Sequence, residues 1–119
     1  MQPEQRDVGK LADMVEFARE VVDLTAGVTF ERFADNRALR LAIERCLELV
    51  GEAASRISNT FRDAHPEVPW SSIIGLRIIL AHEYGKIDYR RLWLIAVERV
   101  PPLINVIQPL LPPPPDDPR

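Results

Sequence analysis

The stretch RALRLAIERCLELVGEAASRI, residues 37–57, decides the fold. Its apolar side chains return every three to four positions, which is the period of an α-helix with one buried face. The pattern lasts about six turns at 3.6 residues per turn. It includes Leu39, Ala42, Ile43, Cys46, Leu47, Val50, Ala53, Ala54 and Ile57. Because charged residues occupy the opposite face, the stretch predicts a long amphipathic helix, which we expect Asp35 to open.

The residues before this stretch also have a helical pattern. Apolar side chains recur with the same period at Leu11, Met14, Val15, Ala18, Val21 and Val22. Asp7 is a suitable N-cap for this first helix, and Gly27 lies just past its end, where glycine is favoured. Thr29 is expected to cap a short turn that carries Phe30 and Phe33 into the core.

The residues after the stretch predict further helices. Residues 61–68 are expected to form a loop, and Pro69 suits the first position of a third helix that ends near Gly85. Asp88 can cap a fourth helix, which Pro101 and Pro102 must break or kink before it resumes. No segment alternates as a strand would. The expected fold class is therefore all-α, an antiparallel bundle of four to five helices.

Composition predicts one domain, residues 1–111, followed by a proline-rich tail, residues 112–119, that is unable to pack. The net charge of −3 argues against a broad nucleic-acid groove but allows a small local site. A single cysteine, Cys46, suits a reducing cytoplasm and most simply packs in the core. No apolar run approaches the ~18 residues that a membrane span needs, so we expect a cytoplasmic protein.

The segment GLRIILAHEY, residues 75–84, contains the residues best suited to chemistry. Arginine is a permanent cation that binds phosphate with two donors, and histidine exchanges a proton near neutral pH. On one straight helix Arg77 and Tyr84 share a face, but His82 is turned about 140° from Arg77. Either the helix loosens near His82, or a second copy of the chain completes the site. Gly75 would permit the close approach that a dimer needs.

The spacing Arg77-x4-His82-x-Tyr84 resembles the signature of the HEPN ribonucleases, specifically the HepT-like toxins. The wider stretch of residues 66–84 and residues 49–54 resemble that family too, and the likeness covers roughly residues 7–111. It implies a homodimer in which two motif helices line one cleft. It also implies a metal-independent endoribonuclease that forms a cyclic 2′,3′-phosphate. The expected partner is a minimal nucleotidyltransferase (MntA-like) antitoxin that silences the toxin by adenylating Tyr84.

Within this hypothesis each residue has an expected role. His82 transfers the proton, and Arg77 stabilises the charge that builds on the phosphoryl oxygens. Glu52 and Arg45 are expected either to border the site or to be solvated helix charges. Three basic residues after the motif either guide an RNA backbone or begin a solvated helix: Lys86, Arg90 and Arg91. No group of acids or histidines has a metal-ligand spacing, so we expect neither a metal nor another cofactor.

Two alternatives stay open at this point. Tyr84 can instead be a buried phenol with one hydrogen bond. The family usually has a polar residue directly after the arginine, whereas this chain has Ile78. The alternative function is therefore a catalytically degenerate HEPN subunit that binds, or serves as a scaffold for, the nucleotidyltransferase.

Overall fold

The structure, a computed structural model, describes residues 5–82 and 88–113, together with all their side chains except those of residues 77–82. The main helices are α1 (Gln5–Thr25), α3 (Arg37–Ser55), α5 (Trp70–His82), α6 (Tyr89–Leu94) and α7 (Val100–Ile107). Two short helices, α2 (Phe30–Ala34) and α4 (Asn59–Ala64), lie between them. A π-helical turn (Ile95–Arg99) joins α6 to α7, and a 3₁₀ turn (Gln108–Leu110) follows α7. The prediction of an all-α bundle is confirmed.

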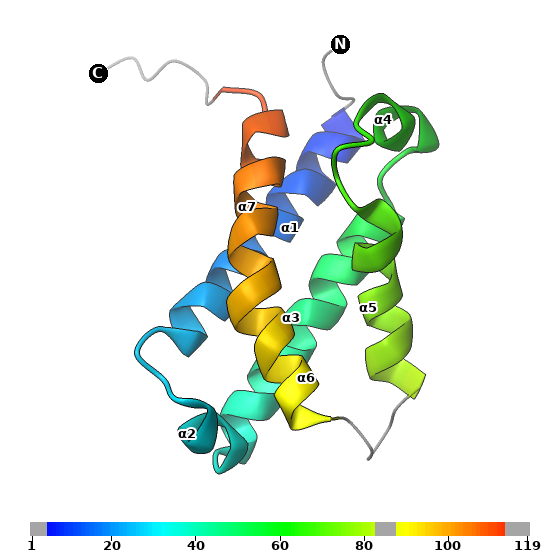
Figure 1. The fold of residues 1–119 in the computed structure, drawn as a ribbon. Coiled ribbons are helices and arrows are strands. Elements are labelled where there is room, and N and C mark those ends of the chain that lie inside the picture. Colours follow the sequence, from blue (N-terminus) through cyan, green and yellow to red (C-terminus); the bar gives the residue numbers. More distant parts are fainter. Residues whose placement is uncertain (1–4, 83–87, 114–119) are drawn as a thin grey trace, which may run out of the picture.

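The long helix α3 lies at the centre of the bundle (Figure 1). It packs against α1 on one side and against α5 on the other, and α7 packs on α1. The core is apolar and draws on every long helix, with Leu11, Val21, Phe33, Ile43, Leu47 and Ile107 among its most buried side chains. No comparable packing joins α5 to α7. The bundle is therefore open along one side in the part of the chain that the structure describes.

The start of α3 differs by one residue from the prediction. Asn36, not Asp35, is the N-cap, because its backbone is extended and its side chain accepts the backbone N–H of Leu39 at 3.0 Å. Asp35 has a helical backbone and ends α2. Thr29 caps α2 as predicted, and this short helix buries Phe33 completely.

Asp7 has a different role from the predicted N-cap. Its carboxylate is 2% exposed and accepts both the backbone N–H of Ser58 (2.9 Å) and the Ser58 hydroxyl (2.7 Å). Ser58 in turn accepts the backbone N–H of Phe61 and caps α4, so residues 61–68 are not entirely a loop. The first turn of α1 is thereby tied to the junction between α3 and α4.

The remaining helix boundaries largely follow the predictions. Gly27 has φ +71°, the left-handed conformation that favours glycine just after a helix. Asp88 caps α6 by accepting the backbone N–H groups of Arg90 and Arg91. The expected break near Pro101 takes the form of the π-helical turn, after which both prolines lie in the first turn of α7. Among the described helices, none is both long enough and apolar enough to span a membrane.

Candidate functional site

The candidate site lies on α5, whose first turns are firmly anchored. Trp70 is buried, and its Nε1–H donates to the carbonyl of His65 at 2.9 Å. Its ring meets that of Phe61 edge-on at 6.3 Å, and Ile73 one turn later is also buried. Pro69 directly precedes the helix, one position earlier than predicted. These contacts tie the start of α5 to α4, and α5 packs along α3.

The backbone of α5 remains α-helical from Trp70 through His82. Arg77 and His82 therefore belong to one continuous helix, on which their positions are about 140° apart. The side chains of both residues, and that of Ile78, are outside what the structure describes. So are Tyr84, Lys86 and the predicted helix end near Gly85. Their roles stay predictions.

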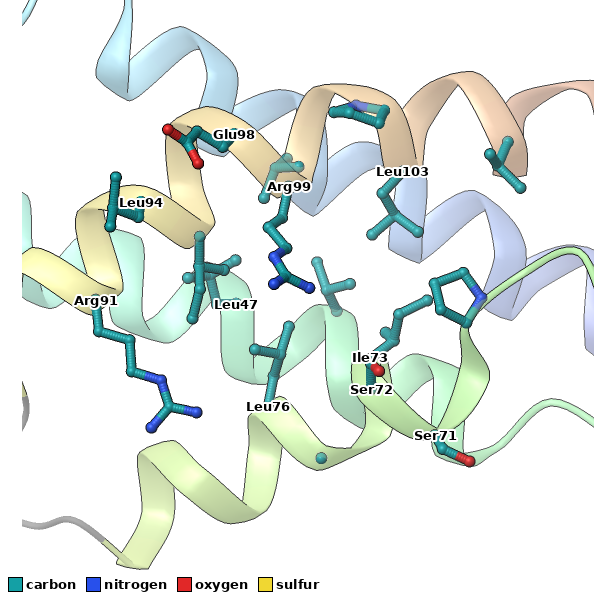
Figure 2. A pocket seen from close by; sticks show the side chains of 17 residues that line it. Leu47, Ser71, Ser72, Ile73, Leu76, Arg91, Leu94, Glu98, Arg99 and Leu103 are labelled. Carbon is teal, nitrogen blue, oxygen red and sulfur yellow. The ribbon is translucent and has the colours of Figure 1, made fainter.

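An open groove of about 710 Å³ runs between α5 and the α6–α7 segment (Figure 2). We refer to it as the α5–α7 groove. Leu47 and Val50 of α3 form its floor. Its two walls come from α5 and from the segment that runs through the π-helical turn into α7, and most of the side chains along them are apolar. The groove exists because α5 packs on α3 and α7 packs on α1, without comparable packing between α5 and α7.

Gly75 lines this groove on the α5 side. A Cβ atom added at Gly75 would meet no atom of a neighbouring element within 4 Å. Nothing in the described fold of a single chain therefore requires glycine at this position, even though glycine lowers helix stability by about 0.8–1.0 kcal/mol relative to alanine. A close approach by another molecule would account for it.

Arg99 projects into the middle of the α5–α7 groove, beside Leu103 and opposite Leu76 (Figure 2). Its guanidinium makes no hydrogen bond or ion pair with any residue that the structure describes. The sequence interpretation did not include Arg99. One signal was available, since Arg99 lies directly before Val100 and three residues after Ala96, and both neighbours are buried.

The predicted border residues are engaged along the surface of α3. Arg45 pairs with Glu48 at 3.0 Å, and Glu52 pairs with Arg56 at 3.2 Å. Neither Arg45 nor Glu52 lines the α5–α7 groove. These contacts are those of solvated helix charges, and a role at the site border stays a prediction.

Two of the basic residues predicted to guide RNA point in different directions. Arg91 lines the α5–α7 groove (Figure 2), whereas the Arg90 guanidinium lies over the ring of Phe30. The other histidine, His65, contacts Glu67 at 3.1 Å. Within residues 5–82 and 88–113, apart from the undescribed side chains, no group of three or more His, Cys, Asp or Glu side chains is arranged to hold a metal ion.

The all-α bundle, with the Arg77-x4-His82 spacing on one continuous helix, defines a HEPN-class protein. The model of the family described as "Ribonuclease HepT-like" matches residues 14–110, and the chain belongs to this family.

Relatives of known name agree with this membership. "Putative RNase MJ1380" of Methanocaldococcus jannaschii is 43% identical over 105 residues, which are 87% of this chain and 96% of the relative. "Probable ribonuclease HepT" of Thermococcus cleftensis is 36% identical over 93 residues, which are 78% of this chain and 84% of the relative. No solved structure is significantly similar to the chain.

Proposed function

We propose that this chain is a metal-independent endoribonuclease toxin that acts in the cytoplasm as a homodimer. The observation that carries the proposal is the Arg77-x4-His82 spacing on a continuous helix of a HepT-like protein. In the proposed reaction the RNA 2′-oxygen loses its proton and bonds to the adjacent phosphorus. The bond from phosphorus to the 5′-oxygen then breaks, and that oxygen takes up a proton. The product is a cyclic 2′,3′-phosphate and a free 5′-hydroxyl.

The chemistry assigns a role to each motif residue. His82 is suited to move the proton at neutral pH. Arg77 is a permanent cation that stabilises the charge on the phosphoryl oxygens as the phosphorus becomes five-coordinate. Because the two positions are about 140° apart on one helix, the site is completed by the motif helix of a second copy.

Two features of the single chain support the dimer. The α5–α7 groove leaves apolar side chains of α3, α5 and α7 uncovered along the motif helix. Gly75 lies in open space on the same helix. A second copy that docks its own α5 along this groove would cover the apolar surface and bring two motifs together, as a two-fold interface requires.

Regulation follows from the position of Tyr84 after the motif. We propose that a minimal nucleotidyltransferase encoded with this chain transfers adenylate to the Tyr84 hydroxyl. The added phosphate would pair with the Arg77 cation and block RNA from the cleft.

The test of the proposed reaction is RNA cleavage by the purified chain in excess EDTA. We expect fragments that end in a 2′,3′-cyclic phosphate, which mass spectrometry distinguishes from a 3′-hydroxyl end. Reversible loss of cleavage on adding EDTA, with recovery on adding a divalent cation, would show that the metal-free mechanism is wrong.

Ile78 favours a second candidate, a catalytically degenerate subunit that binds the nucleotidyltransferase without cutting RNA. The two candidates differ in the effect of expressing the chain alone in cells. A toxin stops growth, and His82→Ala restores growth at the same protein level. A scaffold subunit leaves growth unchanged, whether position 82 is histidine or alanine.

A further inference from the structure

Two arginines lie over aromatic rings at the end of the bundle where α5 finishes and α6 begins (Figure 1). The Cζ atom of Arg40 is 4.4 Å from the ring centroid of Tyr89. The Cζ atom of Arg90 is 4.1 Å from the ring centroid of Phe30. These four residues come from α2, α3 and α6, and we call them the arginine–aromatic surface.

A buried aromatic cluster holds this surface in place. Phe33 is fully buried and packs against Phe30 at 6.2 Å and against Trp93 at 5.0 Å. These contacts join α2 to α6. The position of Arg90 over Phe30 therefore does not depend on a single flexible loop.

The guanidinium groups on this surface retain hydrogen-bonding capacity. Arg90 makes no side-chain hydrogen bond or ion pair with any residue in the described part of the chain. Arg40 donates one N–H to the carbonyl of Ala34. Asp88, the nearest acid in sequence, accepts the backbone N–H groups of Arg90 and Arg91. A guanidinium that contacts a ring through its face can still donate its N–H groups to phosphate oxygens.

Tyr89 adds a second binding element. Its side chain is 42% exposed, so part of it stays open to solvent although Arg40 lies over the ring. Nucleic-acid bases stack on such rings without regard to sequence. Exposed aromatic area combined with phosphate-binding guanidiniums is typical of surfaces that bind single strands.

The surrounding charges limit the strength of such a site. Glu31 of α2 and the residue that ends this helix, Asp35, are exposed and close to Phe30 in sequence. Glu44, one turn after Arg40 on α3, has its pKa raised by burial and by Glu48, while Arg40 lowers it. The local positive charge is thus partly offset. A short strand held for one cleavage event fits this balance better than a long duplex does.

The arginine–aromatic surface is close to the motif along the chain. Five residues lie between His82 and Asp88, and the six steps from one Cα atom to the next span at most about 22 Å. An RNA strand cut at the motif can therefore reach Tyr89 within a few nucleotides.

From these observations we propose that Phe30, Arg40, Tyr89 and Arg90 bind the single-stranded RNA that flanks the scissile phosphate. Tyr89 stacks on a base, and the two guanidiniums bind phosphates. The proposal rests on the proposed ribonuclease function and names the surface that holds its substrate outside the site of cleavage.

The experiment measures RNA binding without cleavage. Full-length His82→Ala protein is titrated into a fluorescently labelled single-stranded 12-mer RNA, and anisotropy gives Kd at several salt concentrations. Adding Tyr89→Leu should raise Kd about tenfold, whereas adding Tyr89→Phe should leave it unchanged because the ring remains. Adding Arg90→Ala should raise Kd and lower the salt slope by about one.

The matched control is Arg6→Ala at the start of α1, at the opposite end of the bundle (Figure 1). It removes the same charge and should leave both Kd and the salt slope unchanged. Equal Kd values for the control and for the Tyr89→Leu and Arg90→Ala variants would overturn the proposal. So would variants that keep RNA binding but lose binding to the purified nucleotidyltransferase, because the surface would then dock a protein.

The outcome is separable from that of the ribonuclease proposal. RNA cleavage that depends on His82 but is unaffected by Tyr89→Leu and Arg90→Ala at limiting RNA would overturn only the binding surface. Binding that depends on Tyr89 and Arg90, in a chain that cuts no RNA, would support the surface and overturn the reaction.

Discussion

At the scale of single residues, buried packing residues and the residues of the proposed reaction follow one another along one helix. Trp70 and Ile73 are buried in the core and anchor the start of α5, whereas Arg77 and His82 follow on the same continuous helix. Changes at the two motif positions should therefore alter the reaction more than the fold. Cys46 is a different case, because burial in the core lowers the reactivity of its thiol.

We expect His82→Ala and Arg77→Ala each to lower the rate of RNA cleavage by about 10²–10⁴-fold, because each removes a group that we propose acts in the transition state. Single-turnover cleavage rates and far-ultraviolet circular dichroism measure the two effects separately. His65→Ala is the matched control, since His65 contacts Glu67 and should be dispensable for cleavage. A His82→Ala protein that cuts at the wild-type rate would remove His82 from the mechanism.

Adenylation at Tyr84 is tested by intact mass after incubation with the partner nucleotidyltransferase and ATP. The wild type should gain one or more adenylate units and lose RNA cleavage, whereas Tyr84→Phe should gain none and continue to cut. Tyr89→Phe is the matched control and should still be modified. An equal mass gain on wild type and Tyr84→Phe would place the modification elsewhere.

Burial and the nearby Glu20 raise the pKa of the Cys46 thiol from its ordinary value of 9.0 to about 11. At pH 8 the thiol should stay protonated, and alkylation by iodoacetamide should be much slower in the folded chain than in urea. The pKa of the thiol is higher in the folded chain than in the unfolded chain. The thiol therefore contributes fully to the free energy of unfolding below pH 9, and this contribution is lost as the pH rises toward 11. Labelling at the same rate in both states would contradict the buried position.

At the scale of elements, the sequence predicts the positions of the helices better than it predicts the packing between them. The apolar period correctly marks Ile43, Leu47 and Val50 as core, and local capping patterns correctly place Thr29 and Asp88. Each of these signals lies within a few residues of the helix or helix end that it predicts. The overlooked helix α4 had such a signal in Ser58.

Features that depend on distant contacts were not predictable in this way. The partner of Asp7 is 51 residues away, so its local pattern suggested a cap instead. The α5–α7 groove depends on two helices that do not pack together, and no residue period encodes that separation. The spacing of Arg77 and His82 was recognisable from the sequence, but the position of Arg99 in the α5–α7 groove was not.

The motif helix leads to a prediction about assembly. Gly75→Glu places a charge twice in the proposed two-fold interface and should convert a dimer into a folded monomer. Gly75→Ala is the control for the fold, since its methyl group meets no neighbouring element in a single chain. Sedimentation velocity at micromolar concentration shows whether each variant is a monomer or a dimer. A wild-type chain that sediments as a monomer would contradict the proposed interface.

At the scale of the whole molecule, the described helices form one bundle around one apolar core. The family match spans residues 14–110, and the described fold becomes exposed soon afterward, at Pro112 and Pro113. The net charge of −3 is spread over a chain whose arginine–aromatic surface is confined to one end. Binding of RNA is therefore expected to be local and salt-sensitive.

Deleting residues 112–119 should change the melting temperature by no more than about 3 °C, because prolines and acids provide little apolar surface to bury. Deleting residues 110–119 is the contrasting variant, since Leu110 and Leu111 pack partly against the core and their loss should lower the melting temperature. Thermal denaturation of the two proteins gives the comparison. A large loss in the shorter deletion would mean that the tail docks on the bundle.

The π-helical turn at Ile95–Arg99 has a consequence in genetic terms. Such a turn is an α-helix with one extra residue, which the wider turn absorbs, whereas a residue lost from a regular helix rotates everything after it by about 100°. Loss of a single codon within this turn should therefore restore a regular helix and leave Val100 and Ile107 close to the buried positions they now hold. Loss of a codon from the regular helix α6 should instead turn both residues away from the core. The reading frame of the protein would survive either deletion, but the packing of its last helix would survive only the first.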